Sequence, residues 1–251
     1  MILSGPSCVG KSPLFKAMAR LFPERLRGLT PIVLHNSRAP RPGERDGVDY
    51  HFGTRERVES LRGGERYVVI DVRGDLQALD LDELRGILER GDAIFEGNPF
   101  VGRTLQAHPL LAQLERLSMF VAPLSREEIE SLKTQPGVAL PALVTDVMRR
   151  KLLRRMRRQK GELSLRDLEE VERRAGSAYE ELREAHHFEH VIPNHDGEDS
   201  ENWDAFYYPL GDARKALLAV VALLEGRTPT GVERWDAGLL PPSNPPARSA
   251  P

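Results

Sequence analysis

The chain has 251 residues, of which 40% are hydrophobic and 29% charged, and this ordinary globular composition excludes collagen-like, low-complexity and coiled-coil proteins. The formal net charge of −2 argues against nucleic-acid or membrane-surface binding, although only six of the 36 basic residues are lysine and the rest are arginine, which suits phosphate and carboxylate. The single cysteine, Cys8, excludes an intrachain disulfide and favours a reducing cytoplasm, and no apolar run approaches the ~20 residues of a membrane span.

Short apolar strands alternate with helical patterns along the chain. In order, the pattern predicts a strand at 1–4, a helix at 12–21, a strand at 31–34, a loop at 36–47, a strand at 67–72, a helix at 81–91 and strands at 93–95 and 118–122. A capping box at 125–128 then starts a helix, followed by one or two polar helices at 149–184, a strand at 190–192 and a helix at 211–225. This alternation predicts an α/β fold with a mostly parallel sheet covered on both faces. The tail, 226–251, has few apolar residues, and we expect it to be disordered.

The strongest motif lies between the first strand and the first helix. It is Gly5-Pro6-Ser7-Cys8-Val9-Gly10-Lys11-Ser12, which matches the pattern G-x-x-x-x-G-K-[ST]. Its glycines let the backbone curl so that N–H groups surround an anion, and the following helix adds its positive end. In such a loop Lys11 reaches the β- and γ-phosphates of a nucleotide and Ser12 holds Mg²⁺. Cys8 is either a small filler of the loop or a thiolate favoured by the helix N-terminus.

A second informative stretch contains two arginines and a tyrosine. It reads Ser37-Arg38-Ala39-Pro40-Arg41-Pro42-Gly43-Glu44-Arg45-Asp46-Gly47-Val48-Asp49-Tyr50-His51-Phe52. Arg38, Arg41 and Tyr50 could converge on a dianionic phosphate through forked hydrogen bonds, or the stretch could be a solvated charged loop.

Together the two stretches resemble the guanylate kinase family, whose members carry Gly-Pro-Ser-x-x-Gly-Lys-Ser and then Arg-x-Pro-Arg-x-Gly-Glu-x-x-Gly-x-x-Tyr-x-Phe. Later segments at 120–128, 173–181 and 188–196 resemble the family as well, so that the resemblance covers about residues 1–225. It implies a P-loop core, an acceptor-binding subdomain at about 34–90, and a helical lid with an insertion at about 130–175.

The resemblance also implies an activity, the transfer of the γ-phosphate of ATP, with Mg²⁺, to GMP to give ADP and GDP. The residues at the matching positions receive the family's roles. Catalysis is assigned to Lys11, Arg174 and a second lid arginine near Arg154 to Arg158, where the alignment is loose and Arg158 is chosen. The other assignments are ATP binding by residues 5–12, acceptor-phosphate binding by Arg38, Arg41 and Tyr50, and metal binding by Ser12 and Glu96.

The positions that read guanine in the family differ in this chain. Leu34 replaces a serine, the strand at 68–70 lacks the family's glutamate, and 77–79 replaces a Tyr-Gly-[Ser/Thr] motif. Asn98 likewise replaces the second acid of an Asp-x-Asp motif. Phosphate recognition is therefore kept while guanine recognition is changed, and Asp71, Asp75 or Gln77 are the candidate substitutes. A site that lacks groups to pair with the base loses discrimination between nucleotides.

Alternative functions stay open at this point. One is a kinase for a non-guanine acceptor, such as another nucleotide or a sugar phosphate, and another is a degenerate enzyme. A third is a non-catalytic module that binds a phosphopeptide or protein through Arg38, Arg41 and Tyr50, against which the intact phosphate loop argues.

Two further segments have more than one interpretation. The basic run at 149–160 is a phosphate-clamping lid, a nucleic-acid or partner-binding face, or a solvated helix face balanced by the acids at 162–172. Nucleic acid is not an expected partner, because the run has no interleaved aromatics. A second insertion carries an aromatic cluster that we expect to pack against the closing helix: Trp203, Phe206, Tyr207 and Tyr208.

Overall fold

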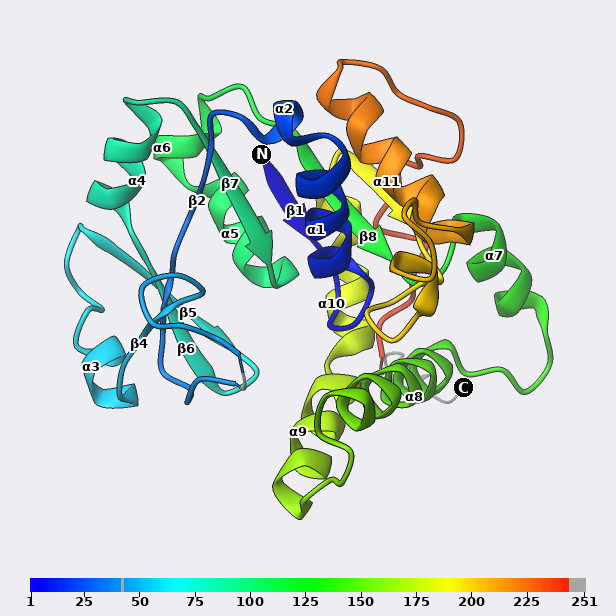
Figure 1. The fold of residues 1–251 in the computed structure, drawn as a ribbon. Coiled ribbons are helices and arrows are strands. Elements are labelled where there is room, and N and C mark those ends of the chain that lie inside the picture. The colour runs from blue at the N-terminus through cyan, green and yellow to red at the C-terminus, as the bar shows by residue number, and fades with distance from the viewer. Residues whose placement is uncertain (42, 244–251) are drawn as a thin grey trace, which may run out of the picture. The chain divides into compact units, whose positions relative to one another are not determined.

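The computed structural model describes residues 1–41 and 43–243, and its mixed α/β architecture confirms the predicted fold class. The chain divides into two compact units, which are described separately. The smaller unit comprises Met1 and Arg27–Glu96, and it contains the range expected to bind the acceptor. The larger unit comprises Ile2–Leu26 and the chain from Gly97 onward, and it contains the phosphate loop (Figure 1).

Three parallel strands form the centre of the larger unit. They are β1 (Ile2–Ser4), β8 (Ser118–Ala122) and β9 (His190–Pro193), hydrogen-bonded in the order β1-β8-β9. Ile2 pairs with Ser118 and Met119 with His190. Every residue of β1 and β8 is buried, as expected for parallel strands covered on both faces. The predicted strands at these three places are confirmed.

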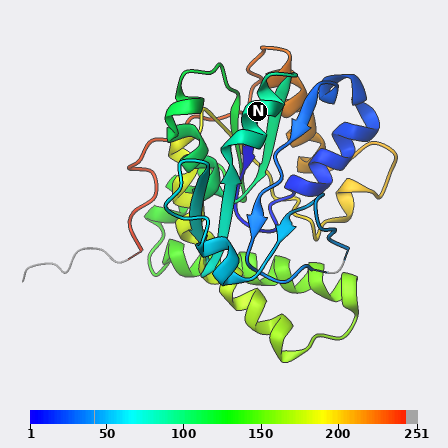
Figure 2. The ribbon, with the colours of Figure 1, turned by 90° about the vertical axis from the view of Figure 1, so that its left-hand side faces the viewer.

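Helices cover both faces of these strands. α1 and α11 pack together on one face, and α5 and α10 lie on the other (Figure 2). None of the helices in residues 1–41 and 43–243 combines the length and apolarity of a membrane span. The helices of this unit are α1 (Lys11–Leu21), α2 (Pro23–Leu26), α5 (Pro99–Ala107), α6 (Pro109–Ala112), α7 (Arg126–Thr134), α8 (Leu140–Lys160), α9 (Leu165–Gly176), α10 (Ala178–Arg183), α11 (Gly211–Leu224) and the 3₁₀ turns η1 (Glu184–His187) and η2 (Glu201–Trp203).

The smaller unit contains one parallel strand pair and one mixed sheet. β2 (Leu29–Pro31) pairs with β7 (Asp92–Gly97), and the mixed sheet has the order β4-β3-β6-β5, with α4 (Leu81–Leu88) following β6. The mixed sheet consists of β3 (His35–Asn36), β4 (His51–Phe52), β5 (Tyr67–Val72) and β6 (Asp75–Asp80). The predicted strand at 31–34 is wrong, because the chain leaves one sheet at Pro31 and enters the other at His35.

A two-residue turn explains why β5 and β6 form a hairpin. Arg73 and Gly74 have φ angles of 58° and 82°. Two successive positive φ angles are typical of a type I′ turn, whose twist matches that of the strands it joins. The sequence analysis assigned no strand to β6, so this hairpin is a finding of the structure.

The two faces of the mixed sheet have different roles. On one face α3 (Arg55–Glu59) packs through Val58 on Leu76 and Ala78. Because side chains alternate along a strand, the neighbouring Gln77 of β6 points to the other face, as does Asn36, which pairs with it on β3. One face is therefore apolar core, and the other presents two carboxamide side chains.

Part of the expected disordered tail is ordered. Glu233 forms an antiparallel bridge with Val191 of β9, with both N···O distances at 2.8 Å. Trp235, Leu239 and Leu240 are buried, and they supply the apolar surface that the tail's average composition concealed. Within residues 226–243 the expectation is wrong, and 244–251 lie outside the described residues.

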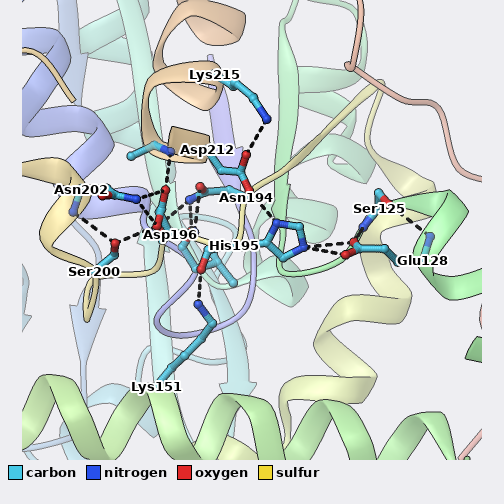
Figure 3. A network of polar contacts seen from close by, with 12 residues as sticks. Ser125, Glu128, Lys151, Asn194, His195, Asp196, Ser200, Asn202, Asp212 and Lys215 are labelled. Atoms are coloured by element: carbon cyan, nitrogen blue, oxygen red, sulfur yellow. Dashed lines mark hydrogen bonds and ion pairs between the residues drawn. The ribbon is translucent and has the colours of Figure 1, made fainter. Parts of the chain in front are cut away.

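A histidine bridges α7 and α11 just after β9. His195 Nδ1 lies 2.6 Å from Asp212 Oδ2, and its Nε2 lies 2.8 Å from Glu128 Oε1 (Figure 3). Burial lowers the pKa of His195, but the two carboxylates outweigh burial and leave the pKa above its ordinary value. The charged imidazolium therefore ties the two helices together.

We expect this bridge to make stability depend on pH. Because the folded pKa of His195 is raised, its contribution is full below the unfolded pKa of about 6.5 and is lost as pH rises through the folded value. The free energy of unfolding should fall in His195→Gln relative to wild type at pH 5.5, and the difference should shrink by pH 9. Chemical denaturation of both proteins at the two pH values measures this difference in the free energy of unfolding. An equal difference at the two pH values would contradict the charged bridge.

Candidate active site

The phosphate loop folds into a cradle between β1 and α1. Cys8 and Gly10 have φ angles of 66° and 98°, so the backbone turns repeatedly through the left-handed region. Gly10 is the N-cap of α1 and receives no side-chain cap, so the first turn of the helix presents its N–H groups to the loop. This arrangement of N–H groups and helix N-terminus suits an anion.

Lys11 curls over the same loop. Its Nζ donates to the carbonyl oxygens of Gly5 and Pro6, each at 2.8 Å, and the residue is buried. The ammonium group is thus held beside the N–H groups of the cradle, where it can bind the outer phosphates of a nucleotide. The sequence analysis assigned the lysine this position.

Arg174 joins the loop from a distant part of the chain. It lies in the last turn of α9, is only 7% exposed, and its Nε donates to Ser7 Oγ at 3.1 Å. The structure thus brings the expected lid arginine to the phosphate loop.

Arg158 has a different neighbour. Its Nη2 lies 2.9 Å from Glu201 Oε1, and about half of its side chain is exposed. Arg155, which lies within the expected range 154–158, is the member of the basic run whose charge acts on Cys8 and on Glu198. The phosphate loop therefore has a second arginine close by, three residues before Arg158.

Cys8 is a buried filler of the loop. Burial raises the pKa of its thiol far above the ordinary value, and the carboxylate of Glu198 adds to the rise. The suggestion that the helix N-terminus favours a thiolate is therefore wrong, because desolvation and the neighbouring negative charge dominate.

In the smaller unit, Arg38 and Arg41 bind the carboxylate of Glu44, and the Tyr50 ring lies against the Arg38 guanidinium. Arg38 Nη1 and Nη2 donate to the two oxygens of Glu44 at 2.6 and 2.7 Å, and the backbone N–H of Arg41 donates to it at 2.7 Å. The Arg38 guanidinium also lies over the rings of Tyr50 and Phe52, at 5.1 and 5.5 Å.

The charges of this cluster are consistent with an anion site. Burial raises the pKa of Glu44, but the donors on Arg38 and Arg41 outweigh it and lower the pKa. Burial also raises the pKa of Tyr50, and the nearby carboxylates of Glu44 and Glu96 oppose the two arginines there. The cluster therefore holds a forked guanidinium on one anion, with a neutral phenol beside the guanidinium, and such a fork also binds phosphate.

The replaced base-reading positions form an apolar and amide surface. Leu34 is buried, and Ile70 of β5 lies opposite Gln77 of β6, which lies opposite Asn36 of β3. Asn36 is fully buried; its Oδ1 accepts from the N–H of Arg38, and its Nδ2 has no hydrogen-bond partner in the part of the chain that the structure describes. Sequence reasoning missed Asn36, because the family motif assigns no role to that position.

Of the three substitutes considered from the sequence, Gln77 fits this surface. Asp71 is used in the hairpin turn, where its Oδ1 accepts from the N–H of Gly74 at 3.0 Å. Asp75 begins β6 opposite Val72, two residues from Gln77. Gln77 is only 8% exposed and lies beside Asn36.

The second acid position of the metal motif is used structurally. Asn98 Nδ2 donates to Glu181 Oε1 at 3.0 Å, and its Oδ1 accepts from the N–H of Phe100 at 2.9 Å as the N-cap of α5. Ser12 and Glu96 belong to different units, and each carries an oxygen of the kind that Mg²⁺ prefers as a ligand. The types of the two side chains therefore fit Mg²⁺.

Comparisons with known proteins agree with this geometry. The family model described as guanylate kinase matches residues 1–138. A guanylate kinase of Mycobacterium sp. (strain MCS) is 34% identical over 165 residues, covering 61% of this chain and 73% of that protein. One from Corynebacterium diphtheriae is 31% identical over 202 residues, covering 79% and 87%. The crystal structure of guanylate kinase from Anaplasma phagocytophilum aligns with a TM-score of 0.50 at 17% identity over 91% of this chain and 86% of that one, which shows the shared fold.

Proposed function

The chain belongs to the guanylate kinase family, and on this premise we propose that it transfers the γ-phosphoryl group of ATP to GMP, giving ADP and GDP. The observation that carries the proposal is the phosphate loop with Lys11 folded over it and Arg174 bound to Ser7. A module that only binds a phosphopeptide through the arginine cluster has no use for these groups. The phosphate loop, Lys11 and Arg174 therefore support a phosphotransferase.

The roles of the residues follow from the charges that move. An oxygen of the acceptor phosphate attacks the γ-phosphorus, a new P–O bond forms, and the bond to the β–γ bridging oxygen breaks as ADP leaves. Such a reaction is accelerated by positioning and charge stabilisation. Lys11 and Arg174 would bind the transferring group, whereas Arg38, Arg41 and Tyr50 would hold the acceptor phosphate in place of Glu44.

Arg158 can join the transferring group only if its pair with Glu201 opens. Arg155 is the stronger candidate for the second lid arginine, because its charge already acts at the phosphate loop. We propose that Ser12 and Glu96 bind Mg²⁺, which when bound neutralises phosphate charge.

Base recognition would rest on Asn36 and Gln77. A carboxamide offers a donor and an acceptor, and the guanine edge has an O6 acceptor beside N1–H and N2–H donors. Two neutral amides can therefore pair with guanine, but they lack the charge of the family's glutamate. We expect selectivity for GMP over AMP to be weaker than a carboxylate would give, because discrimination depends on partners left unpaired by the wrong base.

A coupled ADP-release assay tests this proposal over GMP, dGMP, AMP, UMP, CMP and sugar phosphates. We expect turnover of GMP, and its loss in Arg41→Ala. Arg45→Ala is a matched control, because Arg45 lies in the same loop and is exposed. Turnover confined to a non-guanine acceptor would refute the guanine assignment, and no turnover of any acceptor would refute the kinase.

A further inference from the structure

An acidic segment lies against the phosphate loop. Residues 195–204, here called the acidic strap, follow β9 and include η2. They contain five acids: Asp196, Glu198, Asp199, Glu201 and Asp204. Hydrogen bonds hold the strap to itself and to α11, since Asp196 accepts from Ser200 Oγ at 2.7 Å, from Asn202 Nδ2 at 2.9 Å and from the N–H of Ala213 of α11 at 2.9 Å (Figure 3). These hydrogen bonds therefore fix the conformation of the strap.

The strap and the phosphate loop pack backbone to backbone. A methyl group added at Gly197 would lie 2.2 Å from the carbonyl oxygen of Cys8. One added at Gly10 would lie 2.9 Å from Trp203 Cζ2, and Asn194 Nδ2 donates to the Val9 carbonyl oxygen at 2.8 Å. No space for a side chain separates the two segments at these points.

Glu198 points its carboxylate into this contact. Its Oε2 is buried and has no hydrogen-bond partner within residues 1–41 and 43–243. Burial raises the pKa of Glu198, but the charges of Arg155 and Lys11 and the N–H groups of Glu198 and Gly10 outweigh burial and lower it. The carboxylate is thus an anion beside the lysine and a loop N–H that a nucleotide phosphate would use.

The rest of the strap neutralises the basic face of α8. Asp199 Oδ2 lies 2.7 Å from Arg154 Nη2, and Glu201 Oε1 lies 2.9 Å from Arg158 Nη2. Lys151 donates to the carbonyl oxygen of His195. The expectation that acids at 162–172 balance the basic run is met only in part, by Arg149 with Glu172 and Lys160 with Asp167.

We propose that the acidic strap is an internal phosphate mimic, in which Glu198 occupies the place of a nucleotide phosphate and must leave the loop before a polyphosphate binds. The strap thereby holds the donor site closed. An anion binds only the fraction of molecules in which the strap is out. The apparent Kd is therefore the intrinsic Kd divided by that fraction. The inference rests on the donor half of the proposed function and does not depend on the identity of the acceptor.

Calorimetric titration with metal-free inorganic pyrophosphate tests it. Glu198→Gln keeps the size of the side chain and removes its charge, so we expect pyrophosphate to bind at least about 10-fold more tightly than to wild type. Asp204→Asn removes the same charge from an exposed position of the same strap, and we expect its affinity to stay within about twofold of wild type. Equal or weaker binding to Glu198→Gln would overturn the proposal.

A second measurement follows the strap itself. The chain has two tryptophans, and Trp235→Phe leaves Trp203 of the strap as the only indole. Pyrophosphate should shift the emission of Trp203 as the strap leaves, and binding without a shift would contradict the displacement. If GMP turnover is absent while these results hold, the proposed acceptor is refuted and the strap stands. If GMP turnover is present while Glu198→Gln binds pyrophosphate no more tightly than wild type does, the strap proposal is refuted.

Discussion

Lys11→Met should lower kcat for phosphoryl transfer by about 10³-fold. The ammonium group is buried within the loop and bound to the carbonyls of Gly5 and Pro6, so its position is set before a nucleotide arrives. A preorganised cation of this kind stabilises charge that develops on the transferring group, and removal of one such group costs about 10²–10⁵ in rate. Methionine keeps the aliphatic stem and removes the charge.

The effect should be on kcat more than on the KM for GMP, because the lysine contacts the donor. Lys16→Met is the matched control, since Lys16 lies on the same helix and is exposed. Steady-state kinetics of both variants measure the difference. A change in the KM for GMP with kcat preserved would contradict the assignment of Lys11 to the transferring phosphate.

Local patterns predicted the parts of the site that are contiguous in the sequence. The phosphate loop is one such part, because the motif, the preceding strand and the following helix lie within about 20 residues. The capping box of α7 is another. Ser125 and Glu128 form it as expected, each side chain accepting from the backbone N–H of the other residue. In both cases the interacting groups are neighbours along the chain, so that spacing alone determines which atoms meet.

Contacts between distant segments were predicted only where a family resemblance supplied them. Arg174 meets Ser7 across 167 residues, and no periodicity or spacing could indicate this. Glu198 was missed for the same reason, since the strap has no motif and its contact with the loop depends on how β9 leads into it. The tail was missed because three apolar side chains are enough to anchor a segment of polar average composition. The Arg73-Gly74 turn of β5 and β6 was a local signal that could have been used.

Each of the two proposed phosphate sites holds an internal carboxylate. Glu44 fills the fork of Arg38, and Glu198 faces Lys11 and Gly10. A buried cation without a counter-ion is costly, so both carboxylates stabilise the protein while substrates are absent. In the proposed function a phosphate displaces each of these carboxylates, and this leads to a test at the acceptor cluster.

Arg38→Ala should raise the KM for GMP by about 100-fold, which corresponds to ~3 kcal/mol and lies within the range for truncating one member of a buried charge pair. The side chain is only 10% exposed, binds Glu44 with both terminal nitrogens and covers the rings of Tyr50 and Phe52. Its loss removes the fork that a phosphate needs. It also leaves the Glu44 carboxylate facing the acceptor phosphate, which adds repulsion. Arg45→Ala, in the same loop but exposed, should bind GMP like wild type.

The double variant Arg38→Ala with Glu44→Gln separates these two causes. The glutamine removes the repulsive charge, so we expect it to recover about 10-fold of the lost affinity for GMP without restoring the fork. Isothermal titration with GMP measures both variants and gives the coupling between the two side chains. If the double variant binds GMP no better than Arg38→Ala, then Glu44 does not face the acceptor phosphate. The cluster around Glu44 would in that case stabilise the loop without binding the acceptor, because a carboxylate in the phosphate position cannot be neutral toward an incoming dianion.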